Sequence, residues 1–152
     1  MKKIILKQIA VFSVFALTVA LIDRLIKFIA LTYLQQEFNI LEGILKFSLE
    51  KNQGIAFSIN IPIIMQIVVF PVLLGVGLYF IYKYFDIKKY SVLIISGLIT
   101  GAAIGNFIDR VFYGYVIDYI SISVFPVFNF ADILIVAGIF IFILFYGKIK
   151  RV

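Results

Sequence analysis

The chain has no cysteine and no histidine among its 152 residues. Without these side chains there is no disulfide, no thiol nucleophile, no imidazole base, and no zinc site except one built from carboxylates alone. Hydrolases of the Ser-His-Asp and Cys-His types are therefore excluded. We expect neither a metal nor a cofactor.

Charged residues are also scarce, at 14% of the chain, whereas 64% of the residues are hydrophobic. Uncharged runs near the length of a bilayer crossing, roughly 20 residues, recur along the sequence. The composition predicts an integral membrane protein with about four spanning helices. A chain of this length leaves no room for a soluble module, so we expect residues 1–152 to form a single transmembrane domain.

The uncharged runs predict spanning helices at about 9–34, 62–83, 90–110 and 129–147. The first is longer than the apolar region of a cleavable signal peptide, which has about 7 to 15 residues. Segments 35–58 and 111–128 connect the helices externally. In the first of these, residues 45–50 alternate apolar and polar side chains, as a strand does. Residues 119–124 have no clear period. The predicted fold class is an all-α integral membrane protein with four transmembrane helices and a small external β-strand region.

The basic residues predict the orientation of the helices. Nine of the fourteen precede the first helix, lie between the second and third, or follow the fourth: Lys2, Lys3, Lys7, Lys83, Lys88, Lys89, Lys148, Lys150 and Arg151. The positive-inside rule makes that side cytoplasmic, together with both termini. The basic residues are not gathered on one polar face, so we expect no nucleic-acid partner.

Two aspartates, Asp118 and Asp132, lie in a strongly apolar part of the chain. An ionisable residue within a membrane is expensive, and by default it indicates a functional site. The predicted topology brings further polar residues and one glycine to the same depth, at the outer membrane boundary: Asp23, Lys27, Asn52, Gly54, Asn106, Asp109, Arg110 and Asn129. The sequence therefore predicts one polar cluster that contains two carboxylates.

Five sequence blocks in this order resemble the lipoprotein signal peptidases, the type II signal peptidases of bacteria. The blocks are LIDRLIKF, NQGIAFS, GAAIGNFIDRV, VIDYI and FPVFNFADILIVAG, and together they reach from the first predicted helix to the fourth. Four residues depart from the usual pattern without replacing an acid or an amide of these blocks: Gln53, Ala102, Tyr119 and Phe130. The bulk of Tyr119 and Phe130 suggests a reshaped pocket.

The resemblance implies that Asp118 and Asp132 are the catalytic aspartates. It implies that Asn52, Asn106, Arg110, Asn129 and Ala131 line or support the site, and that Asp23 and Lys27 form a structural or substrate-facing pair. The implied activity removes the signal peptide from diacylglyceryl-modified prolipoproteins, on the amino side of the lipidated cysteine. The implied place is the bacterial cytoplasmic (inner) membrane, with the site near the outer leaflet. Expected partners are these substrates and membrane lipid, and we expect a monomer.

Two carboxyl groups alone can hydrolyse an amide. One ionised aspartate activates water, while a protonated one polarises the carbonyl and later protonates the leaving amine. Carboxyl groups held close together cannot both ionise cheaply, so they share a proton and titrate as a pair.

Each residue also has a simpler interpretation. Asp118 can be a solvated loop carboxylate, Asp132 a favourable charge at a helix N-terminus, and Arg110 a partner of Asp109. Other features can be purely local: an intrahelical pair of Asp23 with Lys27, a turn at Asn52 and Gly54, and close helix packing at Gly101 and Gly105.

Two other function classes remain open at this point. A small proton-coupled transporter would use buried Asp and Lys residues as a relay, and it predicts carboxylates near the midplane and often inverted repeats. A Ser-Lys peptidase would use Lys27 as its base, and its candidate nucleophiles are Ser58, Ser121 and Ser123.

Overall fold

The computed structural model describes residues 2–54 and 61–151, so Ser58 lies outside the described residues. Within these ranges the chain forms five helices and three strands: α1 (Lys2–Tyr33), β1 (Phe38–Leu41), β2 (Leu45–Asn52), α2 (Ile63–Tyr84), α3 (Tyr90–Tyr113), β3 (Val116–Ile122), α4 (Phe130–Leu144) and α5 (Tyr146–Ile149). The prediction of a mostly helical protein with a small strand region is confirmed.

The ends of several helices differ from the predicted ones. Helix α1 begins at Lys2 rather than near residue 9, and it includes the apolar residues 4–6 that lie between the lysines. Helix α3 continues to Tyr113 and ends at Gly114, whose left-handed backbone (φ 77°) lets its N–H donate to the carbonyl of Arg110. The last predicted helix is two helices in the structure, since α4 ends at Leu144 and α5 follows.

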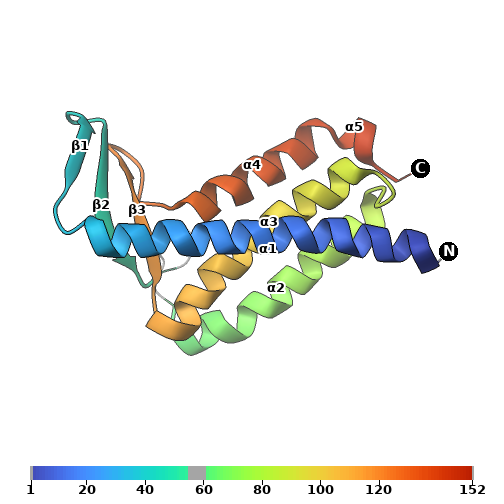
Figure 1. The fold of residues 1–152 in the computed structure, drawn as a ribbon, viewed down its shortest axis with the longest axis horizontal. Helices are drawn as coiled ribbons and strands as arrows, with labels where there is room; N and C mark the ends of the chain where they lie inside the picture. The colour runs from blue at the N-terminus through green and yellow to red at the C-terminus, as the bar shows by residue number, and fades with distance from the viewer. Residues whose placement is uncertain (1, 55–60, 152) are drawn as a thin grey trace.

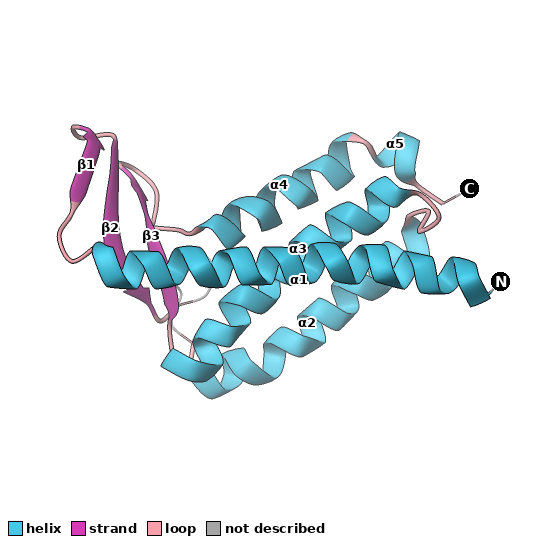
Figure 2. Ribbon diagram, in the orientation of Figure 1, coloured by secondary structure: helices cyan, strands magenta, loops and turns pink. Residues whose placement is uncertain are grey.

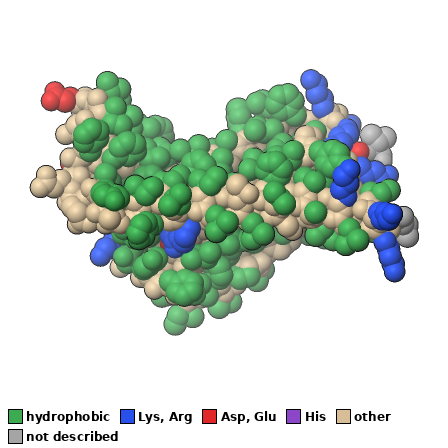
Figure 3. Space-filling model, in the orientation of Figure 1, with side chains coloured by type: hydrophobic (Ala, Val, Ile, Leu, Met, Phe, Trp, Pro, Cys, Tyr) green, Lys and Arg blue, Asp and Glu red, His purple; other side chains and the backbone are tan. Residues whose placement is uncertain are grey.

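The helices lie side by side, and the three strands form a sheet at one end of the bundle (Figure 1). We call this the sheet end; the opposite end, which carries both termini, is the terminal end. Figure 2 shows that the strands are confined to the sheet end. Lysine and arginine side chains gather at the terminal end in the space-filling view (Figure 3). The two ends therefore differ in both structure and charge.

Glycines of α3 allow it to lie close against α1. A Cβ atom at Gly97 would lie 2.7 Å from the carbonyl oxygen of Phe12. A Cβ atom at Gly101 would collide with the backbone of Ala16, and one at Gly105 with the carboxylate of Asp23. Small residues let helix backbones approach in this way. The glycines therefore bring the polar residues of α1 and α3 within contact distance.

The sheet is antiparallel in the order β1-β2-β3. The predicted strand at 45–50 is part of β2, whose Phe47 and Leu49 pack on a buried cluster of Ala30, Ile117 and Tyr119. The pairing of β2 with β3 is irregular between Phe47 and Glu50. This pairing places the end of β2, with Asn52, beside the start of β3.

The outer faces of the helices carry large apolar side chains, including Leu21 on α1, Val68 on α2 and Phe140 on α4. Helices α1, α2 and α3 are long and apolar enough to cross a membrane, and α4 is a shorter apolar helix of 15 residues. Green apolar atoms cover much of the view in Figure 3. Such a surface is suited to a hydrocarbon environment.

Candidate active site

Asp118 lies on β3 and is buried, with 1% of its surface exposed. Its Oδ2 accepts a hydrogen bond from Asn52 Nδ2 at 2.8 Å, and its Oδ1 accepts one from Asn129 Nδ2 at 2.6 Å. Both donors are neutral amides from other elements of the fold. The interpretation of Asp118 as a solvated loop carboxylate is therefore wrong.

Asp132 lies in the first turn of α4, where it forms a capping box with Asn129. The Oδ1 atom of Asn129 accepts from the Asp132 N–H, and Asp132 Oδ2 accepts from the Asn129 N–H, each at 3.1 Å. The other carboxylate oxygen, Oδ1, accepts from Asn106 Nδ2 at 2.8 Å. Asp132 thus helps to cap the N-terminus of α4 and also accepts a hydrogen bond from an amide of α3.

Asn129 connects the two aspartates, and it is fully buried. Its side-chain NH₂ group donates to Asp118 and also, at 3.1 Å, to Asn106 Oδ1. Its side-chain oxygen accepts from Asp132, so every hydrogen-bonding atom of the amide has a partner. One rigidly held asparagine therefore fixes the positions of both carboxylates.

Behind these groups lies a buried charge network, centred on Lys27, whose exposed fraction is 0%. The Lys27 Nζ atom lies 2.8 Å from Asp23 Oδ2, 2.8 Å from Asp109 Oδ2 and 2.7 Å from Asn106 Oδ1. Arg24 pairs with the other oxygen of Asp109 at 2.5 Å. Two carboxylates thus face two cations. Asp23 and Lys27 are more than an intrahelical pair, because Lys27 reaches across to α3.

The simpler interpretation of Arg110 as a partner of Asp109 is wrong. Its guanidinium donates to Gln66 Oε1 at 2.7 Å, to the carbonyl of Asn106 at 3.2 Å and to the carbonyl of Gly54 at 3.4 Å. Asp109 instead faces α1, where it pairs with Arg24 and Lys27, and it also accepts from the Ile117 N–H at 3.2 Å. Arg110 therefore joins α2 and the end of β2 to α3.

The remaining predicted residues have supporting places. Gly54 donates its N–H to Asn52 Oδ1 at 2.9 Å, so the predicted turn exists and also orients the amide that contacts Asp118. Ala131 packs in an apolar cluster with Val19 and Ala102, without a polar role. Among the described residues, the polar partners of Lys27 Nζ do not include Ser121 or Ser123.

Two residues of this region were not predicted as site residues, Arg24 and Gln66. Gln66 is buried, and its Nε2 donates to the carbonyls of Gln53 and Ile61 at 2.8 and 2.7 Å. The sequence held a signal for Gln66, since it is the one amide side chain in the otherwise apolar α2. Polar side chains in spanning helices commonly form interhelical hydrogen bonds.

Burial raises the pKa of Asp118 from 3.8 to about 7. The hydrogen bond from Asn52 opposes this shift, the negative charge of Asp132 adds to it, and Asn129 and Lys27 oppose it. The neighbouring Tyr119 hydroxyl accepts a hydrogen bond from the Phe130 N–H at 3.1 Å, and burial raises its pKa to about 12. At neutral pH Asp118 is therefore divided between its two protonation states, whereas Tyr119 keeps its proton.

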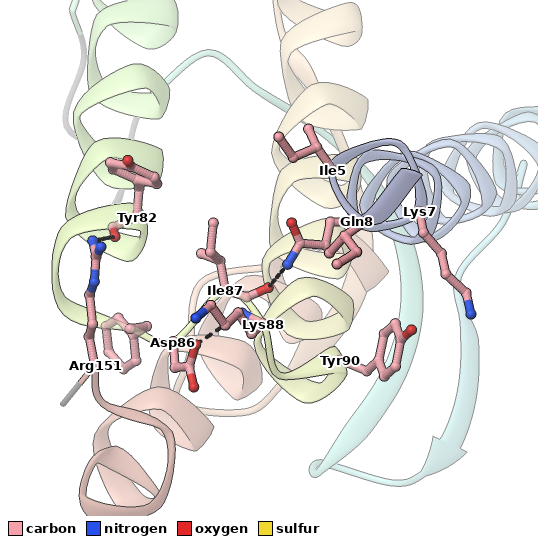
Figure 4. Close-up of a pocket in the computed structure, with 11 residues that line it drawn as sticks. Ile5, Lys7, Gln8, Tyr82, Asp86, Ile87, Lys88, Tyr90 and Arg151 are labelled. Carbon is pink, nitrogen blue, oxygen red and sulfur yellow. Dashed lines mark hydrogen bonds between the residues drawn. The ribbon is translucent and has the colours of Figure 1, made fainter. Parts of the chain in front are cut away.

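A cavity of about 930 Å³ opens at the terminal end and contains none of these groups. It is lined by the first turns of α1, the connection between α2 and α3, and Arg151; Gln8 donates to the Ile87 carbonyl there (Figure 4). A smaller cavity of about 520 Å³ touches Gln53, Ile61 and Gly114, beside the sheet end. The described residues hold no cluster of three acidic side chains that could bind a metal ion.

Comparison with known proteins places this geometry in a family. The family model of signal peptidase (SPase) II matches residues 15–147. A lipoprotein signal peptidase of Halothermothrix orenii is 32% identical over 90% of this chain and 94% of the relative. A lipoprotein signal peptidase of Clostridium novyi is 35% identical over 84% of this chain and 93% of the relative. A solved bacterial membrane enzyme superposes with a TM-score of 0.78 at 27% identity, covering 92% of this chain and 89% of the other.

Proposed function

The chain belongs to the signal peptidase II family, and we propose that Asp118 and Asp132 are the two carboxyl groups with which it cuts its substrate. As a member of this family it is an aspartic endopeptidase that removes the signal peptide from bacterial prolipoproteins. The substrates are diacylglyceryl-modified, and cleavage falls on the amino side of the lipidated cysteine. The observation that carries the assignment is that one buried residue, Asn129, is hydrogen-bonded to both carboxylates.

The surroundings of the two aspartates support different starting roles. Asp118 is buried on β3 with a raised pKa, which favours the protonated form that acts as general acid. Asp132 lies at the N-terminus of α4, where the helix dipole and backbone N–H groups stabilise negative charge, as a general base requires.

The proposed reaction needs only these groups and water. Asp132 takes a proton from the water molecule, and the water oxygen bonds to the scissile carbonyl carbon. At the same time Asp118 gives its proton to the carbonyl oxygen. The C–N bond of the tetrahedral intermediate then breaks. The leaving nitrogen receives the proton held by Asp132, and the intermediate's hydroxyl returns its proton to Asp118, which restores the starting state.

We further propose a four-span arrangement in the bacterial inner membrane. Helices α1, α2 and α3 cross the membrane, and α4 with α5 provides a fourth, shorter crossing. The basic residues of the terminal end favour the cytoplasmic side for that end and for both termini. The sheet end then lies at the outer leaflet. A site at this boundary is reached by water as well as by a lipid-anchored substrate.

The test of the function uses the purified protein in detergent with a synthetic prolipoprotein peptide, in two forms that differ only in the diacylglyceryl group on cysteine. Mass spectrometry should find the signal peptide and a product that begins with the lipidated cysteine. The unlipidated peptide should be cut far more slowly. Absence of product from the lipidated peptide in every detergent tested would contradict the proposal.

The two other function classes have less support. The named relatives are lipoprotein signal peptidases, so nothing among them favours a transporter. For a Ser-Lys mechanism, Lys27 is already held by two carboxylates and an amide. The variants Ser58→Ala, Ser121→Ala and Ser123→Ala should each keep wild-type cleavage; a serine variant without cleavage would reopen that mechanism.

A further inference from the structure

Gln66 lies at the point where the supports of the two aspartates meet. It is 5% exposed and is the one buried residue of α2, whose other residues are exposed or partly exposed. Its NH₂ group donates to the carbonyls of Gln53 and Ile61, and its carbonyl accepts from Arg110. Both ends of the amide are therefore used, and its orientation is fixed.

One branch from Gln66 leads to Asp118. Gln53, whose carbonyl Gln66 holds, directly follows Asn52 at the end of β2. The next residue, Gly54, donates to Asn52 Oδ1, which turns Asn52 Nδ2 toward Asp118. Holding the Gln53 backbone therefore fixes the direction of the amide that hydrogen-bonds Asp118.

The other branch leads to Asp132. Arg110, held by Gln66 at 2.7 Å, donates to the carbonyls of Asn106 and Gly54. Asn106 in turn donates to Asp132 Oδ1. The Gln66 amide and the Arg110 guanidinium together tie the end of β2 to α3, and so keep the support of one aspartate in place relative to the support of the other.

We propose that Gln66 is a positioning residue of the peptidase: it does not touch the reacting atoms, but it holds Asn52 and Asn106 so that the two aspartates face one substrate bond. This inference rests on the proposed roles of Asp118 and Asp132. A catalytic geometry that is misplaced by about 1 Å can lose about 100-fold in rate, so a residue two contacts away can matter.

The positioning role of Gln66 predicts a change in how the cleavage rate depends on pH. The hydrogen bond from Asn52 lowers the pKa of Asp118, so loosening Asn52 should raise that pKa. The charged groups that act on Asp118 are Asp132 of α4, Lys27 of α1 and Arg110 of α3, and Glu50 is its neighbour across the strand pair. Gln66→Met removes none of these charged side chains, and Arg110 keeps its hydrogen bonds to the carbonyls of Asn106 and Gly54. The alkaline limb of activity, where the acid loses its proton, should therefore move to higher pH.

The experiment compares Gln66→Met with Gln8→Met. Both replace a glutamine amide that bonds a backbone carbonyl, but Gln8 lies at the terminal end, where it donates to Ile87. Cleavage of the lipidated peptide should show kcat lowered about 10- to 100-fold in Gln66→Met, with a smaller change in KM and the alkaline limb moved upward. Gln8→Met should keep the wild-type kcat, the wild-type KM and the wild-type alkaline limb.

Equal kcat and an equal alkaline limb in the two variants would overturn the proposal. If Gln66→Met does not fold, Gln66→Glu takes its place for kcat and KM alone: it keeps the acceptor for Arg110 and loses the two donors, but its added charge would itself move the alkaline limb. Failure of both to fold while Gln8→Met folds would mean that Gln66 serves the fold alone, which also contradicts positioning. Failure of the proposed function is separate: it would appear as full activity in Asp118→Asn or Asp132→Asn, whatever Gln66 does.

Discussion

The side chains that hydrogen-bond Asp118 and Asp132 are asparagines, not cations. Asn52, Asn129 and Asn106 supply these hydrogen bonds. The nearby cations have other partners, Lys27 in the charge network and Arg110 on Gln66. A cation in direct contact would favour ionisation of both aspartates and remove the general acid. Neutral amides fix the carboxyl groups and still allow one of them to keep a proton.

The raised pKa of Asp118 predicts how stability depends on pH. The folded state holds the proton up to about pH 7, whereas the unfolded chain loses it near 3.8. The stabilisation is full below pH 3.8 and is lost as the pH rises through about 7. The thermal unfolding temperature in detergent should therefore fall between pH 5 and pH 8.

The matched control is Asp118→Asn, which has no proton to lose and should show a flatter profile over this range. A wild-type profile that is already flat, or one that falls equally in both proteins, would show that Asp118 does not carry the titration.

The Lys27 network predicts a large difference between two lysine variants. Lys27→Met leaves Asp23 and Asp109 buried with less positive charge, which typically costs about 3 to 5 kcal/mol. Lys46→Met breaks only the exposed pair with Glu37, which is worth about 1 kcal/mol or less. Thermal unfolding in detergent should separate the two clearly. Similar losses for both would mean that the buried network is not needed for stability.

At the scale of elements, the site depends on how closely α3 approaches α1. Gly101→Ala places a methyl group against the Ala16 backbone, so the two helices must separate, at a cost of about 1 to 3 kcal/mol. Gly75→Ala, on α2, meets no described atom within 4 Å and should be neutral or slightly stabilising. Unfolding temperatures in detergent check this, and equal values for the two variants would contradict close packing as the role of Gly101.

Strands were predictable from the sequence only where one face is apolar and the other polar. Residues 45–50 alternate in this way and form β2. The first four residues of β3, Val116–Tyr119, are buried on both faces, so burial leaves no alternation to read. All four residues of β1 are exposed, and burial therefore imposed no pattern there either.

Most of the candidate site was predictable because its side chains are costly in an apolar chain. Asp118, Asp132 and the three asparagines have no other evident reason to lie at membrane depth. The partners of Arg110 were not predictable, since Asp109 and Arg110 are adjacent in sequence but contact different helices, α1 and α2. Gln66 was overlooked because a single amide in a long apolar run is a weak signal until its partners are known.

At the scale of the whole molecule, the two ends of the bundle predict one topology. A reporter fused at the C-terminus, at the terminal end, should be cytoplasmic. A reporter inserted at the exposed turn near Glu42, at the sheet end, should be external. Enzymatic reporters active on only one side of the membrane distinguish these outcomes. Reversed labels would place the aspartates on the cytoplasmic side and contradict a site at the outer leaflet.

The central claim is that Asp118 and Asp132 act together as the catalytic pair, and the most direct test is cleavage of the lipidated peptide by Asp118→Asn, Asp132→Asn and the double variant. Asparagine keeps the size of the side chain but cannot exchange the proton. Each single variant should fold and lose about 100- to 10,000-fold in rate, and the double variant should be hardly slower, because residues that act as a unit are not additive. Wild-type turnover in either single variant would contradict the two-aspartate mechanism.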